Sequence, residues 1–322
     1  MSNIKRFFNI LLTLNAVILV SNADIPYKSF DESMSITKNH KKSHDYIVLE
    51  KIYEKNNPSV LGDKKRNTIP KIIHQIWLGP KQIPAKHQEN SNQWRALHPD
   101  WEYKLWTEKD IENWDFSSKD LFNRSSSYQE QADLLRYEVL IKYGGLYLDF
   151  DYQPFKSLDE VHSKYDFYGT TEPIAENADI VVTDALVGSV PNHKIFIETL
   201  KDIRSHWDSE EEKIKHFAPT KERHLIHIGV NRCMIPFGKS VLRNIDSKNS
   251  IVFPTSYMGI VIRDNFLSKI RKFFRMQKRS SIVFEETMAG QMRGESLMSN
   301  LQNIHINEPW HRKLLKQIQI FT

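Results

Sequence analysis

The sequence predicts an α/β fold, and three observations support this prediction. Segments with a helical spacing of apolar residues alternate with short runs of β-branched and aromatic residues. Glycine and proline residues separate many of these segments. The chain has 322 residues, of which 40% are hydrophobic. That content can fill a sizeable core and excludes a globally disordered chain.

The composition also excludes several classes of protein. There are 45 Lys and Arg residues against 40 Asp and Glu residues, a net charge of +5. So small an excess, in a chain that we expect to be exported, argues against a nucleic-acid partner. The single cysteine, Cys233, excludes an intrachain disulfide and a cysteine-rich zinc site.

Residues 1–23 have the pattern of a secretory signal. Lys5 and Arg6 precede an apolar run over 7–20, and small residues follow. Either a cleaved signal peptide or a retained signal anchor fits this pattern. Both place the body in the secretory pathway: lumenal, Golgi-like and type II anchored in a eukaryote, or exported from a bacterium. Residues 24–68 are polar and Lys-rich, and we expect a stem or linker with a short helix near 46–53.

The expected elements then follow in order. A strand over 72–78 ends at a Gly-Pro turn, and a helix over 84–97 and a strand over 101–106 come next. Apolar residues at helical spacing predict a helix up to 143, which two glycines terminate. Period-two alternation predicts a strand over 146–151. Further strands are expected at 180–182 and 250–253, and helices at 194–207 and from about 310.

Asp149 and Asp151 are the centre of the functional prediction. On one strand they would share a face, with about 6.6 Å between their α-carbons. Two adjacent carboxylates repel each other unless a cation lies beside them. Mg²⁺ and Mn²⁺ prefer oxygen ligands and keep positions open for phosphate oxygens. The pair therefore indicates a metal–diphosphate site, although a solvated edge strand would carry the same pattern.

Two further groups of residues fit such a site. Asp133 and Arg136 share a helix face, where they form a surface ion pair or project toward the strand. A guanidinium suits phosphate oxygens, and a carboxylate suits sugar hydroxyls. Trp77 ends a strand, where it packs in the core or offers a platform for a nucleobase.

Four ordered blocks carry a resemblance to a known family. They are IPKIIHQIWLGP (69–80), HPDWEYKLW (98–106), QADLLRY (131–137) and YGGLYLDFD (143–151). Together they resemble glycosyltransferase family 32, the DXD sugar-binding group that includes fungal α-1,6-mannosyltransferases and sphingolipid mannosyltransferases. They are also similar to the catalytic domains of bacterial glucosylating toxins.

The resemblance implies a GT-A fold, with a Rossmann-like mixed central sheet flanked by helices. It also implies a divalent metal, Mn²⁺ or Mg²⁺, and retention of anomeric configuration. A hexose would move from GDP-mannose or a UDP-hexose to an acceptor hydroxyl on a glycan, glycolipid or protein. Residues 69–158 would form the nucleotide-sugar-binding half of the domain. Residues 159–322 would form the acceptor-side half, including a C-terminal segment that closes over metal and donor.

The resemblance also implies roles for donor-binding residues. Trp77 would stack on the base, and Tyr147 would line the nucleoside pocket. Asp133 would bind hydroxyls of the donor sugar, and Arg136 would contact phosphate and sugar. Trp310, near the C-terminus, completes this set.

The metal ligands and catalytic residues follow in the same way. Asp151 would coordinate the metal directly, and Asp149 would contact the ribose or metal-bound water. Before Trp310, His305 and Glu308 occupy the place where the family supplies a further ligand. Asp149 and Asp151, with Arg136, form the predicted catalytic set.

Three points remain as alternatives. Asp184 lines the acceptor pocket or caps a turn. The basic segment 269–279 contacts a membrane peripherally or is a solvated face. The Asp149/Asp151 pair could also belong to a haloacid-dehalogenase-like phosphohydrolase, and the chain could be a glycan-binding module without catalysis.

Overall fold

The computed structural model describes residues 27–34, 42–172, 180–217, 228–258 and 288–291. The predicted signal segment, the basic segment 269–279, the C-terminal helix and residues His305, Glu308 and Trp310 lie outside these ranges.

A six-stranded mixed sheet forms the centre of the molecule, in the order β2-β1-β3-β6-β5-β7. Neighbours β2/β1, β1/β3 and β5/β7 are parallel, whereas β6 runs antiparallel to both β3 and β5. The strands are β1 (Ile72–Ile76), β2 (Glu102–Trp106), β3 (Gly145–Leu148), β5 (Phe167–Thr171), β6 (Val182–Ser189) and β7 (Ser250–Phe253). The predicted α/β fold with a mixed central sheet is therefore confirmed.

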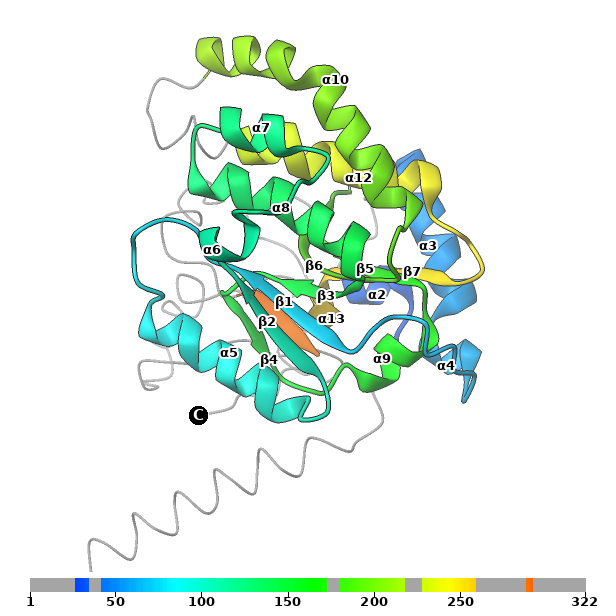
Figure 1. The fold of residues 1–322 in the computed structure, drawn as a ribbon. Helices are drawn as coiled ribbons and strands as arrows, with labels where there is room; N and C mark the ends of the chain where they lie inside the picture. Colours follow the sequence, from blue (N-terminus) through cyan, green and yellow to red (C-terminus); the bar gives the residue numbers. More distant parts are fainter. Residues whose placement is uncertain (1–26, 35–41, 173–179, 218–227, 259–287, 292–322) are drawn as a thin grey trace, which may run out of the picture.

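Helices cover both faces of this sheet (Figure 1). Helices α8 (Tyr128–Tyr143), α10 (Lys194–Phe217) and α12 (Ile235–Asn244) lie on one face, and α5 (Ala85–Leu97) lies on the other beside a second, two-stranded sheet. That small sheet pairs β4 (Tyr152–Pro154) with β8 (Ala289–Gln291). The shorter elements are α6 (Glu108–Ile111), α7 (Lys119–Arg124), α9 (Asp159–Lys164), α13 (Thr255–Met258) and the π-helix η1 (Gly229–Met234).

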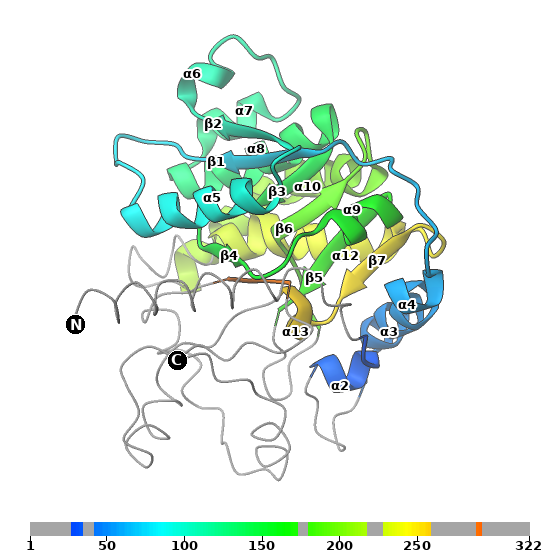
Figure 2. The same cartoon turned by 90° about the horizontal axis from the view of Figure 1, so that it is seen from below.

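The segment expected to be a stem or linker differs from that expectation. It contains α2 (Phe30–Met34), α3 (His44–Asn56) and α4 (Pro58–Leu61) (Figure 2). Helix α3 packs against β7, α2 packs against α13, and α4 contacts α3 and α9. Side chains of α2 and α3 join the main hydrophobic core, among them Phe30, Leu49 and Tyr53. The short helix near 46–53 was correctly predicted. The linker interpretation was wrong for α2 and α3. The Lys-rich composition of this segment gave no sign that apolar residues of these helices are buried.

The predicted strand over 146–151 is shorter than expected. β3 ends at Leu148, and the next residues form a turn in which the Tyr152 N–H donates to the Asp149 carbonyl at 3.1 Å. The predicted geometry, a single strand with both acids on one face, is therefore wrong for Asp149 and Asp151. Both carboxylates instead lie on the turn that follows the carboxyl end of β3.

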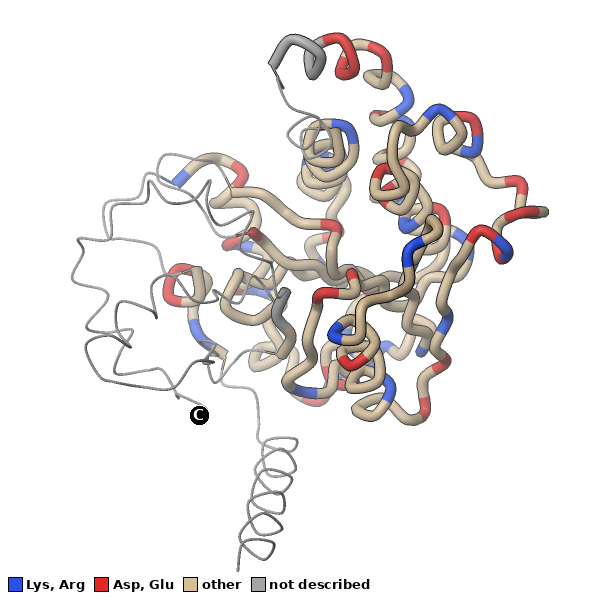
Figure 3. Tube along the Cα trace, turned by 90° about the vertical axis from the view of Figure 1, so that its left-hand side faces the viewer, with Lys and Arg blue, Asp and Glu red and all other residues tan. Residues whose placement is uncertain are grey.

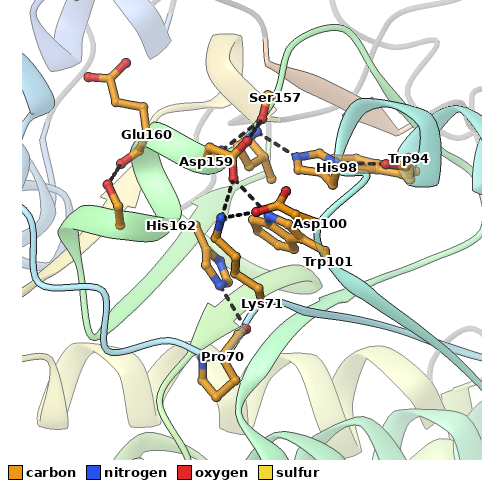
Figure 4. Close-up of polar contacts among 12 residues, drawn as sticks. Pro70, Lys71, Trp94, His98, Asp100, Trp101, Ser157, Asp159, Glu160 and His162 are labelled. Atoms are coloured by element: carbon orange, nitrogen blue, oxygen red, sulfur yellow. Dashed lines mark hydrogen bonds and ion pairs between the residues drawn. The ribbon is translucent and has the colours of Figure 1, made fainter.

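A further group of polar contacts lies just before the amino ends of β1 and β2. Figure 4 shows Lys71 between the carboxylates of Asp100 and Asp159, and Trp101 donating to Asp159 at 2.9 Å. Figure 3 shows acidic and basic residues interspersed along the described trace. Every helix in the described ranges is too short or too polar to cross a membrane.

Candidate active site

Helix α8 presents the charged residues of the candidate site. Ser127 caps its start by accepting from the Glu130 N–H at 3.1 Å, and Gly144, with φ 64°, ends it. These two signals fix the helix register, which places Asp133 and Arg136 on one buried face.

Arg136 is buried and lies among three carboxylates. It pairs with Asp133 and lies 3.5 Å from Asp149. It also lies 3.4 Å from the Asp184 carboxylate and donates to the Asp184 carbonyl at 3.0 Å. The Tyr147 ring packs 4.7 Å from the guanidinium. The surface ion pair that the sequence left open is excluded, because Arg136 is only 5% exposed.

Burial controls the protonation of the groups around Arg136. It raises the pKa of Asp133 to about 7. The guanidinium of Arg136 lowers this pKa, but the negative charges of Asp184 and Asp149 raise it further. Burial also raises the pKa of the Tyr147 phenol well above its usual range. The phenol therefore stays protonated and donates to Asp149 Oδ1 at 2.7 Å.

The acidic turn is held on both sides. The Asp149 N–H donates to the Ala185 carbonyl of β6 at 2.9 Å. From the opposite side, Asn90 of α5 donates to the Phe150 carbonyl at 3.1 Å, and Trp94 donates to the Tyr152 carbonyl at 3.0 Å. The Asp149 side chain remains 28% exposed, so this carboxylate borders solvent.

Trp77 lies against the same turn. It follows β1, and its indole N–H donates to the Lys81 carbonyl at 2.6 Å. The Phe150 ring meets it edge-on at 5.2 Å between centroids. Because Trp77 is half-buried, it is partly accessible for stacking as well as packed in the structure.

The structure thus brings together six of the predicted site residues. Asp133 and Arg136 come from α8, Tyr147 from β3, Asp149 and Asp151 from the turn, and Trp77 from the end of β1. For Asp184, the interpretation as a turn cap was wrong. This residue lies buried within β6, and its carboxylate accepts from the Tyr137 hydroxyl.

Sequence reasoning missed Asn90 and Trp94 as neighbours of the site, and it left the wall at Gly229 unassigned between donor and acceptor. A Cβ atom at Gly229 would lie 3.1 Å from Asp133 Oδ2, so η1 approaches this carboxylate closely. The lone Asp within the apolar run 180–187 could have indicated a buried, paired carboxylate at Asp184. The polar sequence of α5 gave no comparable signal for Asn90.

The residues present suit a divalent cation. Three carboxylates surround the single guanidinium of Arg136, and Asp151 adds a further negative charge on the adjacent turn. Oxygen donors of this kind are those that Mg²⁺ and Mn²⁺ prefer. Within the described ranges, no three His, Cys, Asp or Glu side chains cluster as a complete metal site. Phosphate oxygens, water or residues outside these ranges would therefore complete the coordination.

Comparison with known proteins shows what part of this chain is similar to. Residues 84–168 match the family described as glycosyltransferase sugar-binding region containing DXD motif. This confirms the resemblance to DXD glycosyltransferases on the segment that carries Asp133, Arg136, Tyr147, Asp149 and Asp151. Trp77 lies before the matched residues.

Individual relatives have names that describe glycosyltransferases. The chain is 31% identical over 207 residues to mannosyl phosphorylinositol ceramide synthase SUR1 of Saccharomyces cerevisiae, covering 62% of this chain and 47% of that protein. It is 31% identical over 163 residues to inositol phosphoceramide mannosyltransferase 3 of Schizosaccharomyces pombe, covering 49% of this chain and 43% of that protein. The chain thus spans less than half the length of these two relatives.

Among solved structures, the chain is similar to the catalytic domain of alpha-toxin from Clostridium novyi. The TM-score is 0.44 at 8% identity, covering 90% of this chain and 100% of that domain.

Proposed function

We propose that this chain is a metal-dependent, retaining glycosyltransferase of the GT-A type. It would move a hexose from a nucleoside-diphosphate sugar to an acceptor hydroxyl. One observation carries the proposal: within the matched segment, a buried guanidinium lies 3.5 Å from the first acid of an Asp-Phe-Asp turn, with Trp77 packed against that turn.

Each residue has a role that its surroundings support. Arg136 donates to the diphosphate, because it is a preorganised cation in a water-poor site. Asp133 accepts from sugar hydroxyls, and Trp77 stacks on the base. A bound Mn²⁺ or Mg²⁺ would supply positive charge to neutralise the departing diphosphate.

The two carboxylates of the acidic turn have different proposed roles. Asp149 is occupied by the Tyr147 hydroxyl and by Arg136, which suits an outer position reached through water or the ribose. Asp151 would then bind the cation directly. His305 and Glu308 remain predicted ligands, and Trp310 remains a predicted donor contact.

The names of the relatives narrow the substrates. They act as mannosyltransferases on inositol phosphoceramide, so we propose GDP-mannose as the donor before any UDP-hexose. We propose a glycolipid acceptor before a glycan or protein. A secretory-pathway location, and membrane contact through 269–279, would bring the enzyme to such an acceptor.

A donor and acceptor panel tests this proposal. Purified full-length protein is incubated with GDP-mannose, UDP-glucose or UDP-galactose, with Mn²⁺ or with chelator, and with or without inositol phosphoceramide. We expect release of GDP from GDP-mannose that requires Mn²⁺, and a mannosylated lipid detected by mass spectrometry. Release of no nucleotide from any donor would contradict the proposal.

A further inference from the structure

We infer that one face of helix α5 positions the turn that carries Asp149 and Asp151, with Asn90 as the principal positioning residue. This inference rests on the proposed function, because it concerns how that site presents its carboxylates. It adds a group of residues that lies on the opposite side of the turn from Arg136.

The contacts recur at helical spacing along α5. His87 stacks on the Phe150 ring, with 6.1 Å between centroids. One turn later, Asn90 donates to the Phe150 carbonyl at 3.1 Å. One further turn on, Trp94 donates to the Tyr152 carbonyl at 3.0 Å. Residues three and four positions apart share a helix face, so a single face of α5 meets the whole turn.

Two of these contacts are hydrogen bonds to backbone carbonyls at the turn. Within the turn, the Tyr152 N–H donates to the Asp149 carbonyl. The hydrogen bond from Asn90 to the Phe150 carbonyl is buried, as is the bond from Trp94. Buried carbonyls require a donor, and α5 supplies one to the Phe150 carbonyl and one to the Tyr152 carbonyl.

The hydrogen bond from Asn90 lies where it can influence the two proposed cation-binding carboxylates. The Phe150 carbonyl that Asn90 holds lies between Asp149 and Asp151 in the chain. A shift at this carbonyl therefore changes the relative orientation of the two carboxylates. Groups that orient the ligands of a metal commonly change its affinity 10- to 100-fold when they are replaced.

The same helix offers a matched control. Ser91, next to Asn90, donates to Gln75 Oε1 of β1 at 2.6 Å and makes no described contact with the turn. Ser91→Ala thus removes a buried hydrogen bond from α5 without changing any contact with Phe150.

A second control lies outside α5. For Trp94→Phe the matched variant is Trp101→Phe, which removes an indole hydrogen bond to Asp159 instead (Figure 4).

The test is calorimetric titration of GDP into the full chain, with Mn²⁺ and without it. We expect Asn90→Leu to weaken Mn²⁺-dependent binding of GDP about tenfold or more and to leave metal-free binding unchanged. Trp94→Phe should weaken it in the same direction. Ser91→Ala and Trp101→Phe should stay within about twofold of the wild type.

Thermal unfolding of all four variants separates positioning from loss of fold. If Asn90→Leu does not fold, Trp94→Phe decides the question, because its ring still fills the core. Equal Mn²⁺-dependent affinities in the α5 variants and their controls would overturn the inference alone. If the wild type binds UDP instead of GDP with Mn²⁺, the same titrations are made with UDP. A wild-type protein that binds neither nucleotide with Mn²⁺ would overturn the proposed function, and the inference with it.

Discussion

At the residue scale, Arg136 holds the site together electrostatically. Asp133, Asp149 and Asp184 all pair with this one side chain. Arg136→Ala would leave their charges without a counterion, and we expect the free energy of unfolding to fall by about 3–5 kcal/mol. Urea unfolding at neutral pH measures this effect.

A second substitution, Asp184→Asn, tests whether the stability lost in Arg136→Ala comes from unpaired charge or from lost packing. Asp184→Asn removes one of the competing carboxylates, while its amide oxygen can still accept from the Tyr137 hydroxyl. In an Arg136→Ala background it should restore part of the lost stability. A double variant that is less stable by the sum of the two single effects would contradict the electrostatic account.

Individual site residues differ in how far the sequence could predict them. The shared face of Asp133 and Arg136 follows from helical spacing alone. The contact of Asn90 with Phe150 joins residues 60 positions apart, and no local pattern encodes it. The position of Asp184 within a strand could have been predicted, because its apolar neighbours required a buried strand.

At the element scale, His74 joins β1 to the end of α8. Its Nε2 atom donates to the Gly144 carbonyl at 2.9 Å, and its Nδ1 atom accepts from Trp106 at 3.2 Å. Burial lowers the pKa of His74 from 6.5 to about 4. The neutral ring is therefore part of the folded state.

This shift predicts how stability depends on pH. Between pH 6.5 and 4 the unfolded chain binds a proton at His74 that the folded chain does not, so stability is lost as the pH falls through this window. From pH 7 to pH 5 the loss from His74 is about 2 kcal/mol. Urea unfolding of wild type and His74→Gln at both values should show the variant losing less. Equal losses would contradict the assignment.

The end of β3 shows why the sequence predicted that strand too long. Alternation of apolar and polar residues continues to Asp151, but the ladder with β6 ends at the pair Leu148 and Leu186. Beyond it, the backbone bonds to Ala185, to itself and to α5. Alternation encodes which side chains are buried, whereas pairing depends on a partner strand distant in sequence.

At the scale of the whole molecule, the N-terminal helices belong to the folded body. Leu49 is fully buried, and Asn56 donates to the carbonyls of Ser247 and Ser250 at 2.9 Å each. Leu49→Ala should lower the free energy of unfolding by about 2–5 kcal/mol. Urea unfolding with Ile47→Ala as an exposed control measures it, and an unchanged midpoint would support the linker interpretation instead.

Most of the architecture could be predicted because its signals are local. Helical spacing, Gly144 and Gly145 marked α8, and β-branched runs marked β1 and β7. The docking of α3 on β7 could not be predicted in this way. It depends on the shape of a surface that other parts of the chain build.

The most direct test of the central claim is binding of GDP in the presence and absence of Mn²⁺ to wild type, Asp151→Ala and Asp100→Ala, an exposed acid distant from the turn. Wild type and Asp100→Ala should bind GDP much more tightly with Mn²⁺. Asp151→Ala should remain folded and bind GDP in the presence of Mn²⁺ at least about tenfold more weakly than the wild type, because replacing even a group that only orients a metal ligand costs this much. An Asp151→Ala protein that keeps the full Mn²⁺-dependent affinity would contradict the claim that the acidic turn holds the cation.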